Sequence, residues 1–108
     1  QLAEKSTQAA IKNEANNGLI NDKYSIAMAR TMAPHSATAQ FFINVADNHF
    51  LNFKTEDTHG WGYAVFGRVS AGTEVVDKIK AVNTQSVNGY DDVPIEAVII
   101  ESASLIEE

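Results

Sequence analysis

The sequence predicts a mainly β domain with antiparallel strands and a single helix. Apolar residues alternate with small or polar ones in the runs 24–30, 40–46 and 63–69, the period-two pattern of strands. One later segment changes to helical spacing. The loop between the second and third runs shows no helical crossover, which parallel strands would require.

The first strand, residues 24–30, places Tyr24, Ile26 and Met28 at alternate positions, and Asn-Gly and Asn-Asp turn formers come before it. Residues 10–14 are interpreted as a short extended piece. The second strand, residues 40–46, has two distinct faces. Its core face holds Phe41, Ile43 and Val45, and its other face holds Gln40, Phe42, Asn44 and Ala46.

That other face, with an aromatic ring between two amides, supports two interpretations. In one, Phe42 covers a second small core and Gln40 is simply exposed. In the other, Phe42 and the nearby patch Phe50-Leu51 line an apolar groove, and the Gln40 amide sits beside it. Such a groove would bind an extended apolar peptide.

After the third strand, Val75, Val76, Ile79 and Val82 lie on one face of a helix, and Thr73 is its expected N-cap. Residues 84–92 are expected to form a turn-rich loop. The run 95–106, centred on three β-branched residues, is predicted to be a long final strand.

Composition limits the function classes. The chain has 108 residues, a formal charge of −6 and no cysteine. An acidic domain lacks the basic face that nucleic acids need or that anionic lipids attract. The lack of cysteine excludes disulfides, a thiolate nucleophile and Cys-ligated zinc. We therefore expect a cytoplasmic protein with no nucleic-acid or membrane partner.

The usual catalytic signatures are missing from the sequence, including GxSxG, Gly-rich phosphate loops and HExxH. His35, His49 and His59 have no metal-ligand neighbour at helical spacing and are interpreted as ordinary loop residues. Neither of the adjacent acidic pairs in the loops can be assigned an acid–base role. No metal or cofactor is expected.

Four segments taken together resemble one protein family. They are Met28-Ala29-Arg30, the run 36–44 (SATAQFFIN), Phe50-Leu51 and the run 62–69 (GYAVFGRV). In this order they are similar to the cyclophilins, which are peptidyl-prolyl cis-trans isomerases, and the run 13–19 (NEANNGL) resembles the bacterial cytoplasmic branch. The resemblance implies a closed, eight-stranded antiparallel β-barrel with capping helices. It also implies prolyl isomerisation that assists protein folding, as in a folding chaperone.

The resemblance implies roles for individual residues. Gln40 corresponds to the glutamine that hydrogen-bonds the substrate backbone, and Phe42 and Leu51 correspond to walls of the proline pocket. The segment that pairs with the peptide backbone corresponds to Ala29, Arg30 and Thr31. Phe50 stands where cyclosporin-sensitive members have tryptophan, and Tyr63 stands where eukaryotic members have a pocket-edge histidine. Weak cyclosporin binding is therefore expected.

One family feature has no counterpart in this sequence. The family's catalytic arginine lies in an F-H-R motif upstream of everything recognised here, and neither Arg30 nor Arg68 maps to it. The chain, which starts at Gln1 rather than Met, resembles the C-terminal two-thirds of one cyclophilin domain over residues 1–108. The first strands and first helix are expected to lie outside it.

Two hypotheses follow. In the first, the chain is the C-terminal part of a prolyl isomerase that acts on proline-containing peptides and on unfolded or partly folded proteins. Its remaining segment is then cleaved off, lies outside this sequence or acts as a complementing chain. In the second, it is a non-catalytic module that binds proline peptides or scaffolds a partner. In either case, unpaired strand edges predict a chain of low stability that associates with itself.

Overall fold

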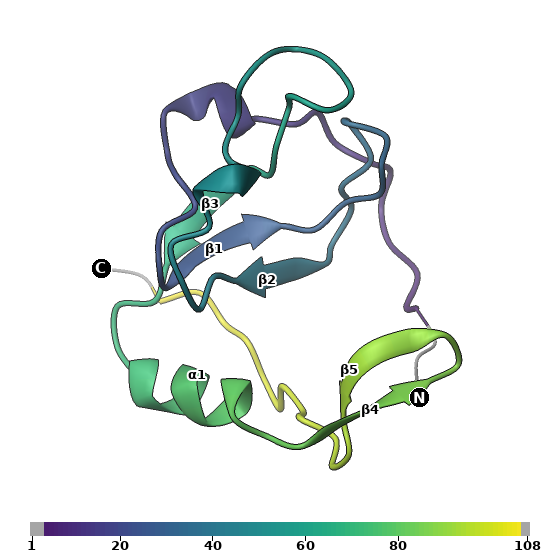
Figure 1. Ribbon diagram of the computed structural model, residues 1–108, viewed down its shortest axis with the longest axis vertical. Coiled ribbons are helices and arrows are strands. Elements are labelled where there is room, and N and C mark those ends of the chain that lie inside the picture. Colours follow the sequence, from purple (N-terminus) through teal and green to yellow (C-terminus); the bar gives the residue numbers. More distant parts are fainter. Residues whose placement is uncertain (1–3, 107–108) are drawn as a thin grey trace. The chain divides into compact units, whose positions relative to one another are not determined.

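The computed structural model describes residues 4–106, and the chain divides into two compact units, Gln1–Thr73 and Glu74–Glu108 (Figure 1). Among the described residues, no helix is long and apolar enough to cross a membrane. The elements in chain order are η1 (Ala15–Asn17), β1 (Ser25–Met28), β2 (Phe41–Ile43), η2 (His49–Leu51), β3 (Val65–Arg68), α1 (Thr73–Lys80), β4 (Thr84–Val87) and β5 (Tyr90–Pro94).

The first unit is built on a three-stranded antiparallel sheet in the order β2-β1-β3. Strand β1 is central, pairing Ile26 with Ile43 of β2 and, after an irregularity, Ala27 with Val65 of β3. The three predicted strands and their antiparallel arrangement are therefore confirmed. The expected extended piece at residues 10–14 is reduced to one antiparallel bridge, in which the Ile11 N–H donates to the Ala37 carbonyl at 2.9 Å.

The buried face of the sheet differs from the predicted one. In β1 the buried residues are the small ones, Ser25 and Ala27, whereas Ile26 and Met28 are half-buried. In the second strand Phe41, assigned to the core from its alternation, is 47% exposed, and Asn44 is buried. Phe41 was wrongly assigned to the core, because the buried positions in and beside the sheet, Ser25, Ala27, Asn44 and Val65, combine an amide network with small or branched apolar side chains.

That network joins the sheet to the loops around it. The Asn44 Nδ2 donates to Asn21 Oδ1 and to Ser25 Oγ, both at 2.9 Å. Asn21 in turn donates to the carbonyls of Leu51 and Tyr63, both at 3.2 Å. Each buried side-chain nitrogen or oxygen in the described part of the chain has a partner. Because an unmade buried hydrogen bond costs about 1–3 kcal/mol, this network fixes the loops relative to β1.

The second unit contains α1 and a β4–β5 hairpin. The predicted helix is confirmed, and its apolar residues Val75 and Ile79 are 53% and 43% exposed. The prediction of a loop at 84–92 was wrong. Asn88 and Gly89 have φ of 51° and 83°, which is the conformation that a tight hairpin turn needs.

The long strand predicted at 95–106 does not form. Its β-branched residues favour an extended chain, but a strand also needs a neighbouring strand to hydrogen-bond with. At the start of this run the Ile95 N–H donates to the Asn83 carbonyl at 2.9 Å, and no ladder follows within residues 95–106. Side chains such as Ile99 and Ile100 are exposed accordingly.

Candidate functional site

An aromatic pair stands at the centre of the candidate site. Phe42 in β2 and Tyr63, just before β3, meet edge to face, with ring centroids 5.8 Å apart and an interplanar angle of 78°. Both side chains are half-buried. Rings in this geometry attract each other beyond their shared burial. The sequence-predicted residues Phe42 and Tyr63 are thus brought together from positions 21 apart in the sequence.

Leu51 is attached to this pair through the backbone. The Tyr63 N–H donates to the Leu51 carbonyl at 2.9 Å, and the same carbonyl accepts from Asn21 Nδ2. Leu51 ends the short helix η2, whose turn is closed by its own N–H on the Asn48 carbonyl. The turn leaves the neighbouring Phe50 with 72% of its surface exposed.

Gly62 allows this close approach of two chain segments. Its φ is +68°, and a Cβ at this position would lie 2.5 Å from the Leu51 carbonyl oxygen. Only glycine therefore fits between η2 and β3 without displacing backbone. Gly62 belongs to the family-like run 62–69, but its steric role was not predicted from the sequence, because it depends on a contact between separate segments.

Arg30 lies against the same segment. Its Nε donates to the Gly62 carbonyl at 2.9 Å, and its Nη1 donates to the Thr31 carbonyl at 2.8 Å. The guanidinium carbon is 4.6 Å from the centre of the Tyr63 ring, within cation–π range. The Gly62 carbonyl also accepts from Asn13 Nδ2 at 3.1 Å.

The remaining predicted residues lie at the surface or beside the sheet. The Ala29 N–H donates to the Gln40 carbonyl at 3.0 Å, so these two residues are adjacent. The exposed Gln40 side chain donates to Glu4 at 3.2 Å. Thr31 is exposed and donates to Ser36 Oγ through both its N–H and its hydroxyl.

The three histidines lie in different surroundings. His35 accepts from the Asn13 N–H through Nδ1 at 3.0 Å and packs edge-on against Trp61. His49 is bonded to Asp22 at 2.8 Å, and Asp47 completes a group whose possible ligand atoms all lie within 4.8 Å of one another. These side chains are accessible to solvent, where acidic groups of this kind are common without an ion. The sequence spacing gave no sign of this cluster, because it joins separate loops.

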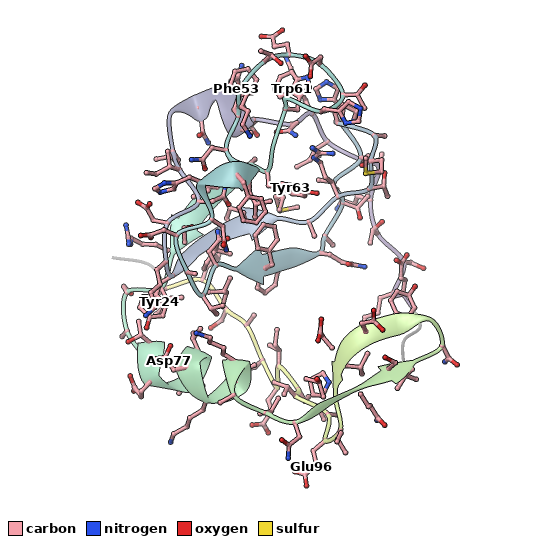
Figure 2. All side chains as sticks on the ribbon, viewed as in Figure 1. Tyr24, Phe53, Trp61, Tyr63, Asp77 and Glu96 are labelled. Atoms are coloured by element: carbon pink, nitrogen blue, oxygen red, sulfur yellow. The ribbon has the colours of Figure 1, made fainter. Side chains whose placement is uncertain are left out.

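Hydrogen bonds lower the pKa of one carboxyl group in the loop before Trp61. The Thr55 hydroxyl donates to Asp57 at 2.7 Å and, with the backbone N–H groups of Gly60 and His59, holds the pKa of Asp57 below its ordinary value. These bonds close the loop that leads to Trp61, which packs edge-on against Phe53 (Figure 2). They hold the shape of this loop.

The first unit also contains a cavity of about 410 Å³ that sequence reasoning did not foresee. Its lining is mainly apolar and includes Ile11, Leu19, Met28, Val65 and Phe66, together with Arg30. Phe42 and Tyr63 do not line it. The aromatic pair and this cavity are therefore separate features of the unit.

A family model described as cyclophilin type peptidyl-prolyl cis-trans isomerase/CLD matches residues 1–105. The chain belongs to the cyclophilin family. Antiparallel sheets and a single α-helix within the described residues agree with the mainly β fold expected for a cyclophilin domain. Closure of these sheets into a barrel stays a prediction.

Curated bacterial cyclophilins resemble this chain over nearly all of its length. Peptidyl-prolyl cis-trans isomerase cyp18 of Streptomyces antibioticus is 61% identical over 105 residues, which cover 97% of this chain and 63% of the relative. Peptidyl-prolyl cis-trans isomerase B of Escherichia coli (strain K12) is 59% identical over 106 residues, covering 98% and 65%. Peptidyl-prolyl cis-trans isomerase A of Dickeya dadantii is 50% identical, covering 99% and 55%. This cyclophilin chain thus spans less than two-thirds of the length of each.

Proposed function

We propose that this chain forms the part of a peptidyl-prolyl cis-trans isomerase that binds the proline ring of the substrate. The observation that supports it most strongly is the contact between Phe42 and Tyr63, with Leu51 joined to Tyr63 through the backbone. Three separate segments of the chain, at residues 42, 51 and 63, thereby meet in one region. The curated relatives carry the name of this activity.

The reaction explains why such residues are needed. Rotation about an X-Pro bond crosses a barrier of about 18–20 kcal/mol because amide resonance is lost in the twisted state. A catalyst must bind that twisted state better than either planar isomer. Rings from Phe42, Phe50 and Tyr63, with Leu51, would hold the proline ring while the rest of the peptide turns. No bond is made or broken, so no cofactor is needed.

The peptide backbone would be held at the adjacent surface. The exposed Gln40 amide can both donate and accept a hydrogen bond, and its surface contact with Glu4 is one that a peptide can replace. The segment Ala29–Thr31 is joined to Gln40 through the Ala29 N–H. We assign Gln40 and Phe42 to the reacting region, and Ala29, Arg30, Thr31, Phe50, Leu51 and Tyr63 to substrate binding.

Electrostatic stabilisation of the twisted amide requires a further group. Arg30 already donates to the Gly62 and Thr31 carbonyls, and Arg68 lies in β3 at the edge of the sheet. The family arginine has no counterpart among residues 1–108. We therefore assign that electrostatic role, usually the largest in catalysis, to a segment bearing this arginine, on the same chain or on a complementing one.

The test compares isomerisation of a proline-containing tetrapeptide, measured by NMR exchange, by the chain alone and by the chain extended with the arginine-bearing segment. Acceleration by the extended chain that Phe42→Ala abolishes supports the proposal. Phe41→Ala is the matched control, because Phe41 is a neighbouring ring in β2 that is 47% exposed. Peptide binding without acceleration, even with the segment, would instead favour a non-catalytic binding or scaffold module.

We further propose that the substrates include unfolded or partly folded proteins in the cytoplasm, in keeping with the acidic, cysteine-free composition. Isomerisation of X-Pro bonds takes tens to hundreds of seconds without a catalyst and limits the folding of many proteins. The extended chain should accelerate the slow refolding phase of a protein limited by proline isomerisation. An unchanged slow phase would count against folding clients.

Cyclosporin is expected to bind weakly. Phe50, in the position of the family's tryptophan, is 72% exposed and lacks the indole N–H donor. Titration calorimetry with the extended chain should show weak binding, and Phe50→Trp should tighten it by restoring the donor and a larger apolar surface. A tight complex with the unchanged protein would refute this expectation.

A further inference from the structure

The guanidinium of Arg30 faces protein groups on several sides. Nε donates to the Gly62 carbonyl and Nη1 to the Thr31 carbonyl. The guanidinium carbon lies 4.6 Å from the centre of the Tyr63 ring. A longer contact of 3.5 Å joins Nη1 to the Met32 carbonyl. Charge-assisted hydrogen bonds to carbonyls are among the stronger ones in proteins. A residue held in this way has a fixed position before any peptide arrives.

What Arg30 holds is the segment that carries Tyr63. Gly62 directly precedes Tyr63, and its carbonyl accepts from both Arg30 Nε at 2.9 Å and Asn13 Nδ2 at 3.1 Å. The same peptide group also donates through the Tyr63 N–H to the Leu51 carbonyl, and on the other side of the Cα the Tyr63 carbonyl accepts from Asn21 Nδ2 at 3.2 Å. The backbone on both sides of the Tyr63 Cα is therefore fixed, and the guanidinium covers the ring as well.

From these contacts we infer that Arg30 is a positioning residue: it holds the Tyr63 ring against Phe42 and so sets the shape of the proline-binding region. The inference rests on the proposed function for its substrate. It assigns to Arg30 an action through Tyr63 in place of direct contact with the peptide. Arg30 acts on the proline-binding region through two successive contacts: the guanidinium lies over the Tyr63 ring, and that ring lies 5.8 Å from the Phe42 ring.

The geometry requires arginine in particular. A planar guanidinium donates in its plane through Nε and Nη1 while its face rests on an aromatic ring. Lysine has the charge but neither the planar face nor the Nε donor. Arg30→Lys should therefore make the position of the Tyr63 ring less fixed even though the charge remains. Arg30→Met, which keeps much of the aliphatic side chain but no charge, should have a larger effect.

The experiment measures two quantities on the same variants. Proton NOEs between the Tyr63 and Phe42 rings report the ring contact, and an NMR titration reports the affinity for a proline-containing tetrapeptide and for its alanine counterpart. Arg30→Lys and Arg30→Met should weaken the ring NOEs and lower the affinity for the proline peptide by about threefold to tenfold, the range of a lost cation–π contact. Affinity for the alanine peptide should stay unchanged.

Arg68→Lys is the matched control, because Arg68 is exposed in β3; it should alter neither quantity. Unchanged amide shifts in β1 and β3 would show that the variants fold. Loss of peptide affinity with intact ring NOEs would overturn the inference, since Arg30 would then contact the peptide directly. Intact NOEs and intact affinity would overturn it too. If the unchanged chain binds the proline and alanine peptides equally, it is the proposed function that fails.

Discussion

Tyr24 has a backbone conformation that is unfavourable for residues other than glycine. Its φ is +71°, in the left-handed region where a Cβ crowds the following carbonyl, and it lies directly before β1. The turn nevertheless stays closed, because the Tyr24 N–H donates to the Asn44 carbonyl and the Tyr24 carbonyl accepts from the Val69 N–H. Backbone pairing on both sides thus holds the residue in this conformation.

Glycine should be favoured over alanine at this position. The free energy of unfolding of Tyr24→Gly is expected to exceed that of Tyr24→Ala by about 0.5–1 kcal/mol, the cost of a left-handed residue less the entropy that glycine loses on folding. Urea unfolding measures it. Tyr24→Ala is the control, since it removes the ring and its 5.0 Å contact with the Lys23 ammonium but keeps the strain. Equal stability of the two variants would contradict the prediction.

The pKa of Asp57 provides a second test at the scale of single residues. The Thr55 hydroxyl, which donates to it at 2.7 Å, is the main cause of its lowered pKa. A carboxyl with a pKa lower in the folded than in the unfolded state stabilises the fold above its ordinary pKa, and this contribution is lost as pH falls through the lowered value. Thr55→Val should move the pKa of Asp57 back up towards its ordinary value, as followed by NMR titration. No movement would show that the backbone N–H groups suffice.

Individual residues of the site were predictable in part. The motif identified Phe42, Leu51 and Tyr63, and the structure brings these three together. Arg30 was assigned to peptide pairing, and its bonds to the Gly62 and Thr31 carbonyls were not foreseen, because an exposed arginine and a bonded one look alike in sequence. The buried amides were missed for a related reason: asparagine is also frequent in turns.

At the scale of elements, the spacing of apolar residues correctly predicted the strands and the helix whose formation depends on their own local sequence. Strands β1, β2 and β3 and helix α1 all lie within the predicted runs. The β4–β5 hairpin was missed although its Asn88-Gly89 pair is a strong hairpin signal. The strand expected at 95–106 shows the opposite error, since β-branched composition cannot supply the neighbouring strand on which pairing depends.

The junction between η2 and β3 depends on one glycine. Gly62→Ala should cost the strain of a left-handed residue, about 1–2 kcal/mol, and about 1–3 kcal/mol more from overlap with the backbone of Leu51 and Asn52. Gly18→Ala is the matched control, because Gly18 has φ of +85° but no atom within 4 Å of a Cβ. Urea unfolding of both variants separates the two costs. Equal destabilisation would show that the overlap relaxes freely.

At the scale of the whole molecule, the apolar core is small. The buried hydrophobic residues in the described structure are Ala15, Ala27, Ala37, Trp61 and Val65, and large side chains such as Met32, Phe50 and Phe66 are more than half exposed. In addition, β2 and β3 each have one edge with no ladder partner among residues 4–106. Exposed apolar surface and open edges both favour association.

Sedimentation velocity of the chain alone should therefore show association that increases with concentration, and heating should give a broad transition in place of a cooperative one. Phe66→Lys, in edge strand β3, should reduce the association, because a charge at a strand edge opposes pairing. Glu56→Lys, in an exposed loop, adds positive charge away from the sheet and should not. A monomer with a sharp thermal transition would contradict the prediction.

The surroundings of Trp61 give the molecule an internal optical probe. It is the chain's single tryptophan, 6% exposed, and its ring meets His35 on one side and Phe53 on the other. Its fluorescence therefore originates from one place, two residues before Tyr63. Emission at short wavelength would signal an intact loop, and a red shift would signal water entering beside the candidate site. Trp61 fluorescence can thus follow opening of that loop separately from events in the β4–β5 hairpin.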